Sequence, residues 1–152
     1  IAKGIGGGFP LGACLATASV AKHMTAGTHG STYGGNPLAM TMGNAVLDVL
    51  EEENILGNVL KMSDRLRIEL MKLRKKYPEI IDTVRGLGLM MGLKLHIEPR
   101  EFVMQAFENK LLVVGASENT VRILPPLNIT SADIDEAVAK IDKTCLTLLK
   151  KM

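Results

Sequence analysis

A lysine near the start of the chain has surroundings that are unusual for a charged side chain. Lys3 begins the stretch KGIGGGFP, and no carboxylate occurs before Asp48. Burial lowers the pKa of a lysine, and a neutral lysine amine can attack a carbonyl carbon to form a Schiff base. The glycines would let the backbone approach a ligand closely. The alternative is an exposed lysine beside a flexible loop, which composition alone favours because most lysines are solvated.

A second group of polar residues occupies Gly30 to Pro37, which reads GSTYGGNP. The hydroxyls of Ser31 and Thr32 precede a glycine pair and the expected start of a helix. Helix N-termini attract anions through their free N–H groups and their dipole, so a phosphate group beside Ser31 and Thr32 is chemically reasonable. A structural turn followed by a helix cap, with no ligand, explains the same residues equally well.

A third candidate is Arg122, within TVRILPP. Alternation along a strand places Arg122 on the face opposite Val121 and Ile123, and the strand must end at the two prolines. A guanidinium there could hold a carboxylate through two hydrogen bonds. A solvated arginine at a strand edge is the simpler alternative. Arg85, in VRGLG, has the same two interpretations, with a tight turn nearby as the simpler one.

Several other classes of site do not match the sequence. No GK[ST] follows the first glycines and no GxGxxG is present, so both nucleotide-binding motifs are excluded. His23 and His29 are six residues apart with no acidic partner, which is a poor metal-ligand spacing. A net charge of +2 and 3% aromatic residues do not indicate a nucleic-acid-binding surface. No apolar run is long enough to span a membrane, and Cys14 and Cys145 form no disulfide framework, which favours a reducing compartment.

The chain changes in composition near residue 48. Before it, Lys3 and Lys22 are the only charged residues, and 10 of the 15 glycines lie in this part. A free surface would carry more charge, so we expect this segment to be buried against another domain or another subunit. The chain opens at Ile1, inside an expected element and without an initiator methionine. We therefore expect a fragment of a longer protein.

Hydrophobic periodicity predicts alternating strands and helices that position these residues. Asn36 and Pro37 are typical of an N-cap and a first helical residue, and Thr130 with Asp133 is typical of a capping box. The pattern indicates a small α+β layer in which helices cover one face of a short sheet. The expected strands are 11–17, 89–95, 111–115 and 120–124, and the expected helices begin near residues 37, 56, 99 and 131.

Three segments together resemble the class III aminotransferases, which depend on pyridoxal phosphate. They are AKGIGGGFPLGA at 2–13, HGSTYGGNPLA at 29–39 and RILPPL at 122–127, in the order that the family has them. The resemblance covers essentially the whole chain. Each segment alone is weakly specific, whereas the three in order are highly specific. Within the family, the likeness is greatest to members that act on N-acetylornithine.

The resemblance implies a role for each candidate residue. Lys3 matches the lysine that forms a Schiff base with pyridoxal phosphate and then moves a proton between the substrate Cα and the cofactor C4′. Thr32 matches the threonine that reaches the cofactor phosphate of the neighbouring subunit, and Ser31 lies beside it. Arg122 matches an arginine that binds a substrate carboxylate. No metal, nucleic acid or membrane is implied, and the partners are amino-acid and 2-oxo-acid substrates in a cytoplasmic homodimer.

The resemblance also implies a fold and a reaction. The fold is α/β, with residues 1–45 as the tail of a large cofactor-binding domain, 46–77 as a linking helix and 78–152 as a small α+β domain. The reaction is amino transfer from N-acetylornithine to 2-oxoglutarate, in arginine biosynthesis, with ornithine or another ω-amino acid as the alternative donor. Other cofactor contacts lie upstream in the family, so we expect the fragment alone to be inactive. A non-catalytic interaction domain with the family shape is the alternative of another class.

Overall fold

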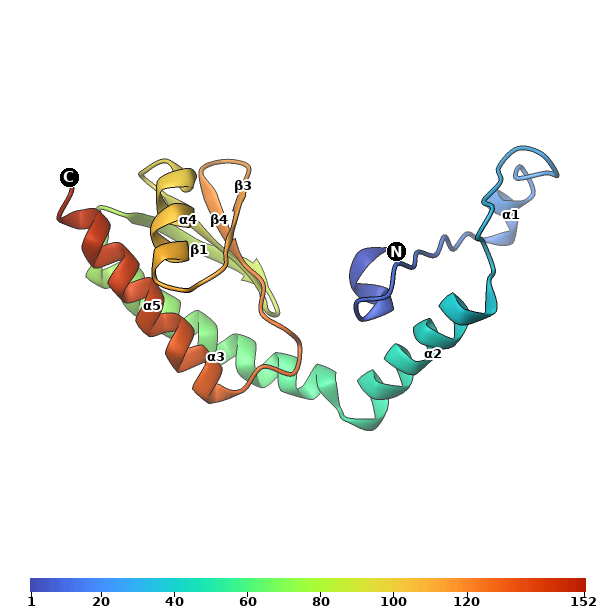
Figure 1. Ribbon diagram of the computed structural model, residues 1–152, viewed down its shortest axis with the longest axis horizontal. Helices are drawn as coiled ribbons and strands as arrows, with labels where there is room; N and C mark the ends of the chain where they lie inside the picture. The colour runs from blue at the N-terminus through green and yellow to red at the C-terminus, as the bar shows by residue number, and fades with distance from the viewer. The chain divides into compact units, whose positions relative to one another are not determined.

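The computed structural model describes residues 1–152, which form two compact units (Figure 1). Unit 1 is Ile1–Asn54 and unit 2 is Ile55–Met152. Unit 1 contains the 3-10 helix η1 (Lys3–Gly6) and the helices α1 (Ala18–Ala21) and α2 (Pro37–Glu52). Unit 2 contains α3 (Ile55–Lys76), β1 (Ile81–Leu87), β2 (Met90–Leu95), α4 (Pro99–Glu108), β3 (Val114–Ala116), β4 (Thr120–Ile123) and α5 (Ser131–Leu149).

Unit 1 is built around a short closed loop and one long helix. An isolated bridge pairs Ala2 with Gly12, and the Ala13 N–H donates to the Ile1 carbonyl at 2.8 Å. The predicted strand at 11–17 is wrong, because beyond this bridge no neighbouring strand in the chain supplies a ladder of hydrogen bonds. The predicted start of α2 is confirmed, since the Asn36 side chain accepts a hydrogen bond from the Ala39 N–H at 2.9 Å.

Unit 2 is a four-stranded antiparallel sheet covered by helices on one face. The strand order is β1-β2-β4-β3. The covered face and the helices α3, α4 and α5 share one hydrophobic core, which confirms the predicted α+β layer. α5 begins with the predicted capping box between Thr130 and Asp133. The core side chains of the sheet include Val84, Met91, Leu93, Val121 and Ile123, and those of the helices include Leu66, Leu70, Phe102, Ile134 and Ile141.

Two details of this sheet differ from the prediction. β1 was not expected, and it forms a hairpin with β2 in which Leu87 pairs with Met90. The expected strand at 111–115 is present only as the shorter β3, Val114–Ala116, which pairs with β4. The expected linking segment at 46–77 contains the end of α2 and the whole of α3, and the units divide at Asn54. No helix is both long and apolar enough to cross a membrane.

Candidate functional site

Lys3 lies on a constrained turn of unit 1. Its backbone φ is +64°, a left-handed conformation that is uncommon for a residue with a side chain. The turn is closed by a hydrogen bond from the Gly7 N–H to the Gly4 carbonyl at 3.1 Å. The Lys3 side chain is exposed and forms no ion pair with a carboxylate of the chain. Unit 1 therefore presents a single amine on a glycine-rich turn, and does not itself bury it.

Ser31 and Thr32 lie in the turn that leads into α2. The Gly34 N–H donates to the Ser31 carbonyl at 3.1 Å, and a side chain at Gly34 would crowd Ser31. Both hydroxyls are exposed. They stand just before the N-terminus of a 16-residue helix, where free N–H groups and the helix dipole favour an anion. No hydrogen bond joins Lys3 to either hydroxyl.

Arg122 projects from the open face of the sheet in unit 2. The strand register aligns Arg85, Gly92 and Arg122 across β1, β2 and β4. Val121 and Ile123 are buried on the other face, so the predicted alternation is confirmed. Arg122 is exposed and has no carboxylate partner in the chain. It borders a shallow hollow of about 260 Å³, whose lining also includes Arg85, Gly92 and Thr120.

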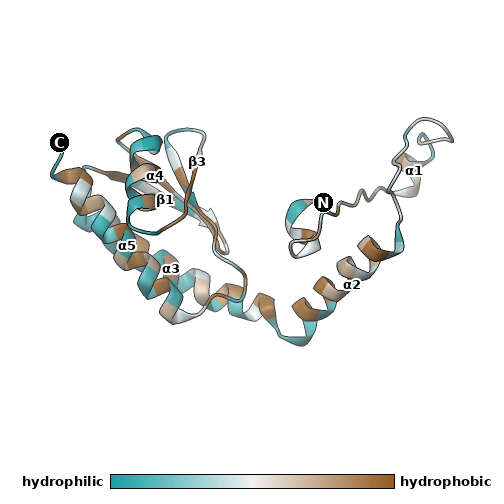
Figure 2. Cartoon of the chain, in the orientation of Figure 1, coloured by the Kyte–Doolittle hydropathy of each residue, from teal (hydrophilic) through white to brown (hydrophobic).

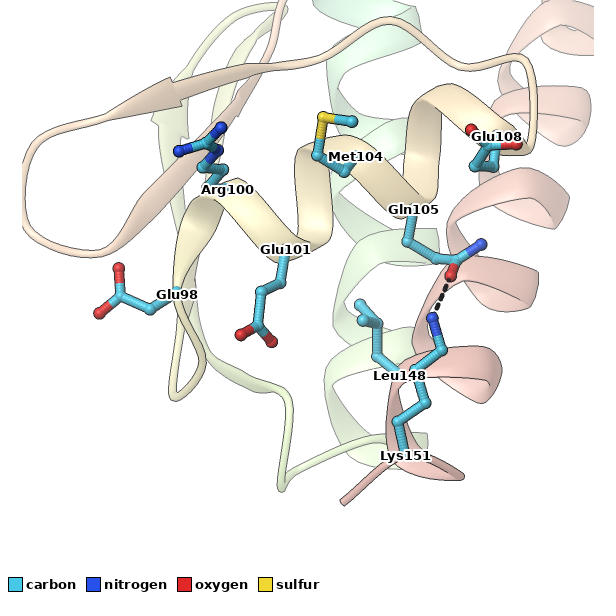
Figure 3. A pocket seen from close by; sticks show the side chains of 8 residues that line it. All are labelled: Glu98, Arg100, Glu101, Met104, Gln105, Glu108, Leu148 and Lys151. Atoms are coloured by element: carbon cyan, nitrogen blue, oxygen red, sulfur yellow. Dashed lines mark hydrogen bonds between the residues drawn. The ribbon is translucent and has the colours of Figure 1, made fainter.

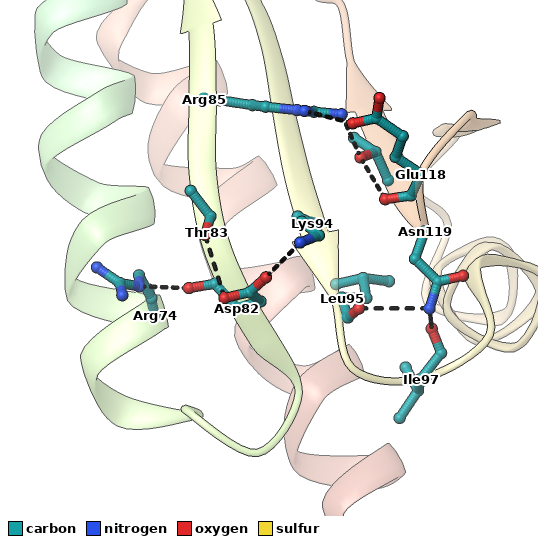
Figure 4. Close-up of polar contacts among 10 residues, drawn as sticks. Arg74, Asp82, Thr83, Arg85, Lys94, Leu95, Ile97, Glu118 and Asn119 are labelled. Carbon is teal, nitrogen blue, oxygen red and sulfur yellow. Dashed lines mark hydrogen bonds and ion pairs between the residues drawn. The ribbon is translucent and has the colours of Figure 1, made fainter.

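Both terminal nitrogens of Arg85, the neighbouring arginine, form hydrogen bonds within the protein. One guanidinium nitrogen donates to the Glu118 carboxylate at 2.8 Å (Figure 4). The other donates to the Thr120 hydroxyl at 3.0 Å. The hydrogen bond from Arg85 lowers the pKa of Glu118, and the positive charge of the guanidinium adds to this effect. The sequence alone pointed to Arg85 but not to Glu118. The two residues come together only because β1, β2 and β4 are neighbours in the sheet.

Gly92 makes the hollow between the two arginines possible. A Cβ at this position would lie 2.9 Å from a methyl group of Thr120 and 3.7 Å from the Arg85 side chain. The absence of a side chain at Gly92 therefore leaves open space between Arg85 and Arg122. Strand periodicity alone could not have given this alignment, because it also depends on strand order and register.

A larger surface hollow lies elsewhere in unit 2. It has a volume of about 760 Å³ and runs along α4 to the end of α5 (Figure 3). None of the predicted site residues lines it, and the Lys151 ammonium donates across it to the Gln105 side chain at 2.9 Å. The side chains around it are Glu98, Arg100, Glu101, Met104, Gln105, Glu108, Leu148 and Lys151. No group of three or more His, Cys, Asp or Glu residues could hold a metal ion.

The chain matches proteins whose names are informative. It is 47% identical to acetylornithine aminotransferase 2 of Caulobacter vibrioides over 95% of this chain and 36% of that protein. It resembles the crystal structure of acetylornithine aminotransferase from Elizabethkingia anophelis, with a TM-score of 0.85 and 34% identity over 96% of this chain and 39% of that one. It also resembles ornithine aminotransferase from Toxoplasma gondii, with a TM-score of 0.79 and 31% identity over 88% and 32% of the two chains.

These matches agree with a model of one protein family. The chain spans about a third of the length of the relatives that it matches. The Toxoplasma gondii enzyme has partial occupancy of pyridoxal phosphate at its active site in that structure. The model of Aminotransferase class-III matches residues 1–145, which include Lys3, Ser31, Thr32 and Arg122. The chain belongs to the class-III aminotransferases, a family of enzymes that depend on pyridoxal phosphate.

Proposed function

We propose that this chain is the C-terminal portion of an aminotransferase that moves an amino group from N-acetylornithine to 2-oxoglutarate, in arginine biosynthesis. The observation that carries the proposal is the unpaired amine of Lys3. It stands on a glycine-rich turn in a chain of this family, and the resemblance of residues 2–13 matches it to the lysine that forms the Schiff base. The unprotonated lysine amine is the form that bonds to a carbonyl carbon, and no carboxylate of the chain holds Lys3 in an ion pair.

The residues present fit pyridoxal phosphate. Lys3 would hold the aldehyde carbon of one cofactor, and the exposed hydroxyls of Ser31 and Thr32, beside the N-terminus of α2, would hold the phosphate of the cofactor in the neighbouring subunit. When bound, the cofactor supplies an electron sink that stabilises negative charge at the substrate Cα. The Lys3 amine is then the base that takes the proton from Cα. Arg122 would fix the substrate through its carboxylate, since a guanidinium can hold a carboxylate with two hydrogen bonds and no carboxylate of this chain pairs with it.

The choice of amino donor rests on the relatives. Curated relatives named acetylornithine aminotransferase are 43–49% identical to this chain. The ornithine aminotransferase of Toxoplasma gondii is 31% identical. These identities favour N-acetylornithine over ornithine or another ω-amino acid as the donor. Both donors carry an α-carboxylate, so Arg122 serves either and does not itself select between them.

The proposed enzyme is a homodimer, and this chain contributes parts of two domains to it. In this proposal residues 1–45 end the large cofactor-binding domain, 46–77 link the two domains and 78–152 form the small domain. The apolar side chains exposed on unit 1, such as Tyr33 at 82% and Leu38 at 60%, support a partner surface around Thr32. Thr32 would then reach the cofactor phosphate of the neighbouring subunit. The proposed protein acts in the cytoplasm, and this chain alone is inactive.

Reductive trapping tests the role of Lys3. The complete enzyme is incubated with pyridoxal phosphate and borohydride, and the labelled peptide is mapped by mass spectrometry. We expect the label on Lys3, its loss in Lys3→Ala and its retention in Lys22→Ala, the other lysine of unit 1. An unlabelled Lys3 in a folded, complete enzyme would exclude the Schiff-base role and leave a non-catalytic domain with the family shape.

Substrate profiling tests the donor. Initial rates are measured with N-acetylornithine, ornithine and 4-aminobutyrate, each at the same concentration of 2-oxoglutarate. We expect the highest kcat/KM with N-acetylornithine. A higher value with ornithine would reassign the donor without affecting the role of Lys3.

A further inference from the structure

The glycine-rich turn that carries Lys3 packs against one face of α2. Within residues 36–52, the residues that are not exposed recur at intervals of three and four, which places them in one stripe along the helix. They are Asn36, Ala39, Gly43, Val46 and Leu50. η1 lies against α2 (Figure 1), and its Gly6 is buried. This stripe is therefore the surface on which the Lys3 turn rests.

Leu11 fills the space between η1 and α2. A Cβ on Gly6 would lie 3.3 Å from the Cβ of Leu11, and a Cβ on Gly43 would lie 3.0 Å from its Cδ2 methyl group. The base of the Leu11 side chain thus lies against η1, and its tip lies against α2. Both approaches are this close because Gly6 and Gly43 have no side chain.

Val46 makes a second contact, one helical turn from Gly43. A Cβ on Gly7 would lie 2.8 Å from the Cγ2 methyl group of Val46, and Gly7 has a φ of +57°. Gly7 ends η1, and its N–H donates to the Gly4 carbonyl at 3.1 Å. The turn and the helix therefore meet at two points, and each of them contributes one side chain and one glycine.

The position of Leu11 is also linked to that of Lys3 through the backbone. An isolated bridge pairs Ala2 with Gly12. The first of these directly precedes Lys3 and the second directly follows Leu11. The turn between them is rich in glycine, and a Cβ on Gly4 would meet nothing within 4 Å. Such a segment has many accessible conformations, so contacts outside it must fix where the lysine lies.

We propose that Leu11 and Val46 are positioning residues that fix the Lys3 turn on α2. This inference rests on the proposed function, in which the Lys3 amine bonds to the cofactor and moves a proton. Neither side chain has a polar atom, so both act through the backbone of the turn. A small displacement of a reacting group lowers the rate of a reaction strongly even when its cause lies away from the reacting atoms.

A pair of valine variants of the complete enzyme tests the contact at Gly7. Rates are measured with N-acetylornithine and 2-oxoglutarate at saturating pyridoxal phosphate. In Val46→Ala, we expect kcat to fall about ten- to a hundredfold with the KM of both substrates unchanged, because the lysine is displaced and the substrate contacts are not. The control is Val49→Ala, on the same helix outside the stripe, where the side chain is 45% exposed. We expect no change in its kcat, once both variants are shown to have the same subunit state.

A glycine variant separates positioning from helix stability. Gly43→Ala adds a methyl group 3.0 Å from the tip of Leu11. Alanine is a better helix former than glycine, so an effect on α2 alone would not reduce activity. We expect kcat to fall in Gly43→Ala and to recover when Leu11→Val shortens the crowding side chain. An unchanged kcat in Val46→Ala, or a loss in Gly43→Ala that Leu11→Val does not repair, overturns the inference.

Hydrogen exchange keeps the test independent of turnover. It is measured on the complete enzyme without cofactor, in peptides that cover residues 1–13. We expect faster exchange in Val46→Ala, no change in Val49→Ala, and exchange in Gly43→Ala that returns to its original rate with Leu11→Val. This pattern in a protein whose Lys3 takes no label from pyridoxal phosphate and borohydride supports the positioning of the turn and contradicts the proposed function. Exchange that is the same in all variants overturns the inference.

Discussion

Two cysteines show how far the chemistry of one residue type depends on its surroundings. Cys145 lies on α5 in the core of unit 2, and burial raises the pKa of its thiol to about 12. The negative charge of Asp142 adds to this rise. Cys14 is exposed in unit 1. Because the thiolate is the reactive form and a reagent must reach it, Cys14 is the accessible cysteine and Cys145 is not.

This difference predicts selective modification. With Ellman's reagent near neutral pH, we expect the native chain to react at one thiol and the chain in denaturant to react at two. Peptide mapping should place the first modification on Cys14, and Cys14→Ser should remove it. Equal rates at the two thiols in the native chain would contradict the burial of Cys145.

The raised pKa of Cys145 also makes stability depend on pH. An unfolded thiol loses its proton near its ordinary pKa of 9.0, whereas the folded thiol keeps its proton up to about pH 12. Between these values ionisation favours the unfolded state, so the free energy of unfolding decreases as the pH rises. Below pH 9 this contribution is fully present. Denaturant melts from pH 8 to pH 11 should show a shallower decline for Cys145→Ala than for the unmodified chain.

The candidate residues themselves could be named from the sequence, while their neighbours could not. Lys3 and Arg122 stand out by type and position, in an uncharged stretch and before a pair of prolines. The partnership of Arg85 with Glu118 spans 33 positions and exists only because β1, β2 and β4 are adjacent. Such a contact depends on strand order and register, which periodicity within one segment does not determine.

Among the elements, α3 is a helix that packs against the core of unit 2 through one of its faces. Leu66, Leu70 and Leu73 are buried in the core of unit 2, while Ile68 is 56% exposed. Ser63 is also buried, and its hydroxyl donates to the Leu60 carbonyl at 2.9 Å. Packing of the buried face, more than helix propensity, therefore stabilises this 22-residue helix.

Two substitutions on α3 measure this difference. Leu70→Ala, at a fully buried position, should lower the free energy of unfolding by about 2–5 kcal/mol, because it removes buried methyl groups and leaves a cavity. Ile68→Ala, two residues earlier on the exposed face, should change it by less than about 0.5 kcal/mol. Urea titrations of the two variants provide the comparison. Similar losses in both would mean that the burial of α3 differs from that in the structure.

The accuracy of prediction also differed among the elements for physical reasons. Helices with a cap and a sustained apolar stripe, such as α2 and α5, were correctly placed at their starts. β1 was missed because Ile81–Leu87 mixes charged and small residues, and only its antiparallel pairing with β2 makes it a strand. The apolar run at 11–17 was predicted to be a strand, yet an apolar run needs a neighbouring strand, and this chain supplies only one bridge.

At the scale of the whole molecule, the two units differ in how many of their residues are buried. Unit 2 has a continuous core from three helices and a sheet, whereas Gly6 and Ala39 are the only buried residues of unit 1. Apolar residues of α2 remain exposed and appear as brown bands along the helix (Figure 2). An exposed apolar surface of this kind is typical of a segment that another surface covers. In the proposed enzyme, the remainder of the large domain and the second subunit provide that cover.

Hydrogen exchange tests this difference between the units. Amides in the core of unit 2 open only through global unfolding, while those of unit 1 can open with little loss of buried contact. In the 152-residue chain, we therefore expect peptides from α3, β2 and α5 to exchange slowly and peptides from 1–54 to exchange rapidly. In the complete enzyme, residues 1–54 should become as protected as unit 2, because their apolar side chains are then covered. Slow exchange of 1–54 in the 152-residue chain would show that unit 1 is stable without a covering surface, and would remove the argument that its apolar face is an interface.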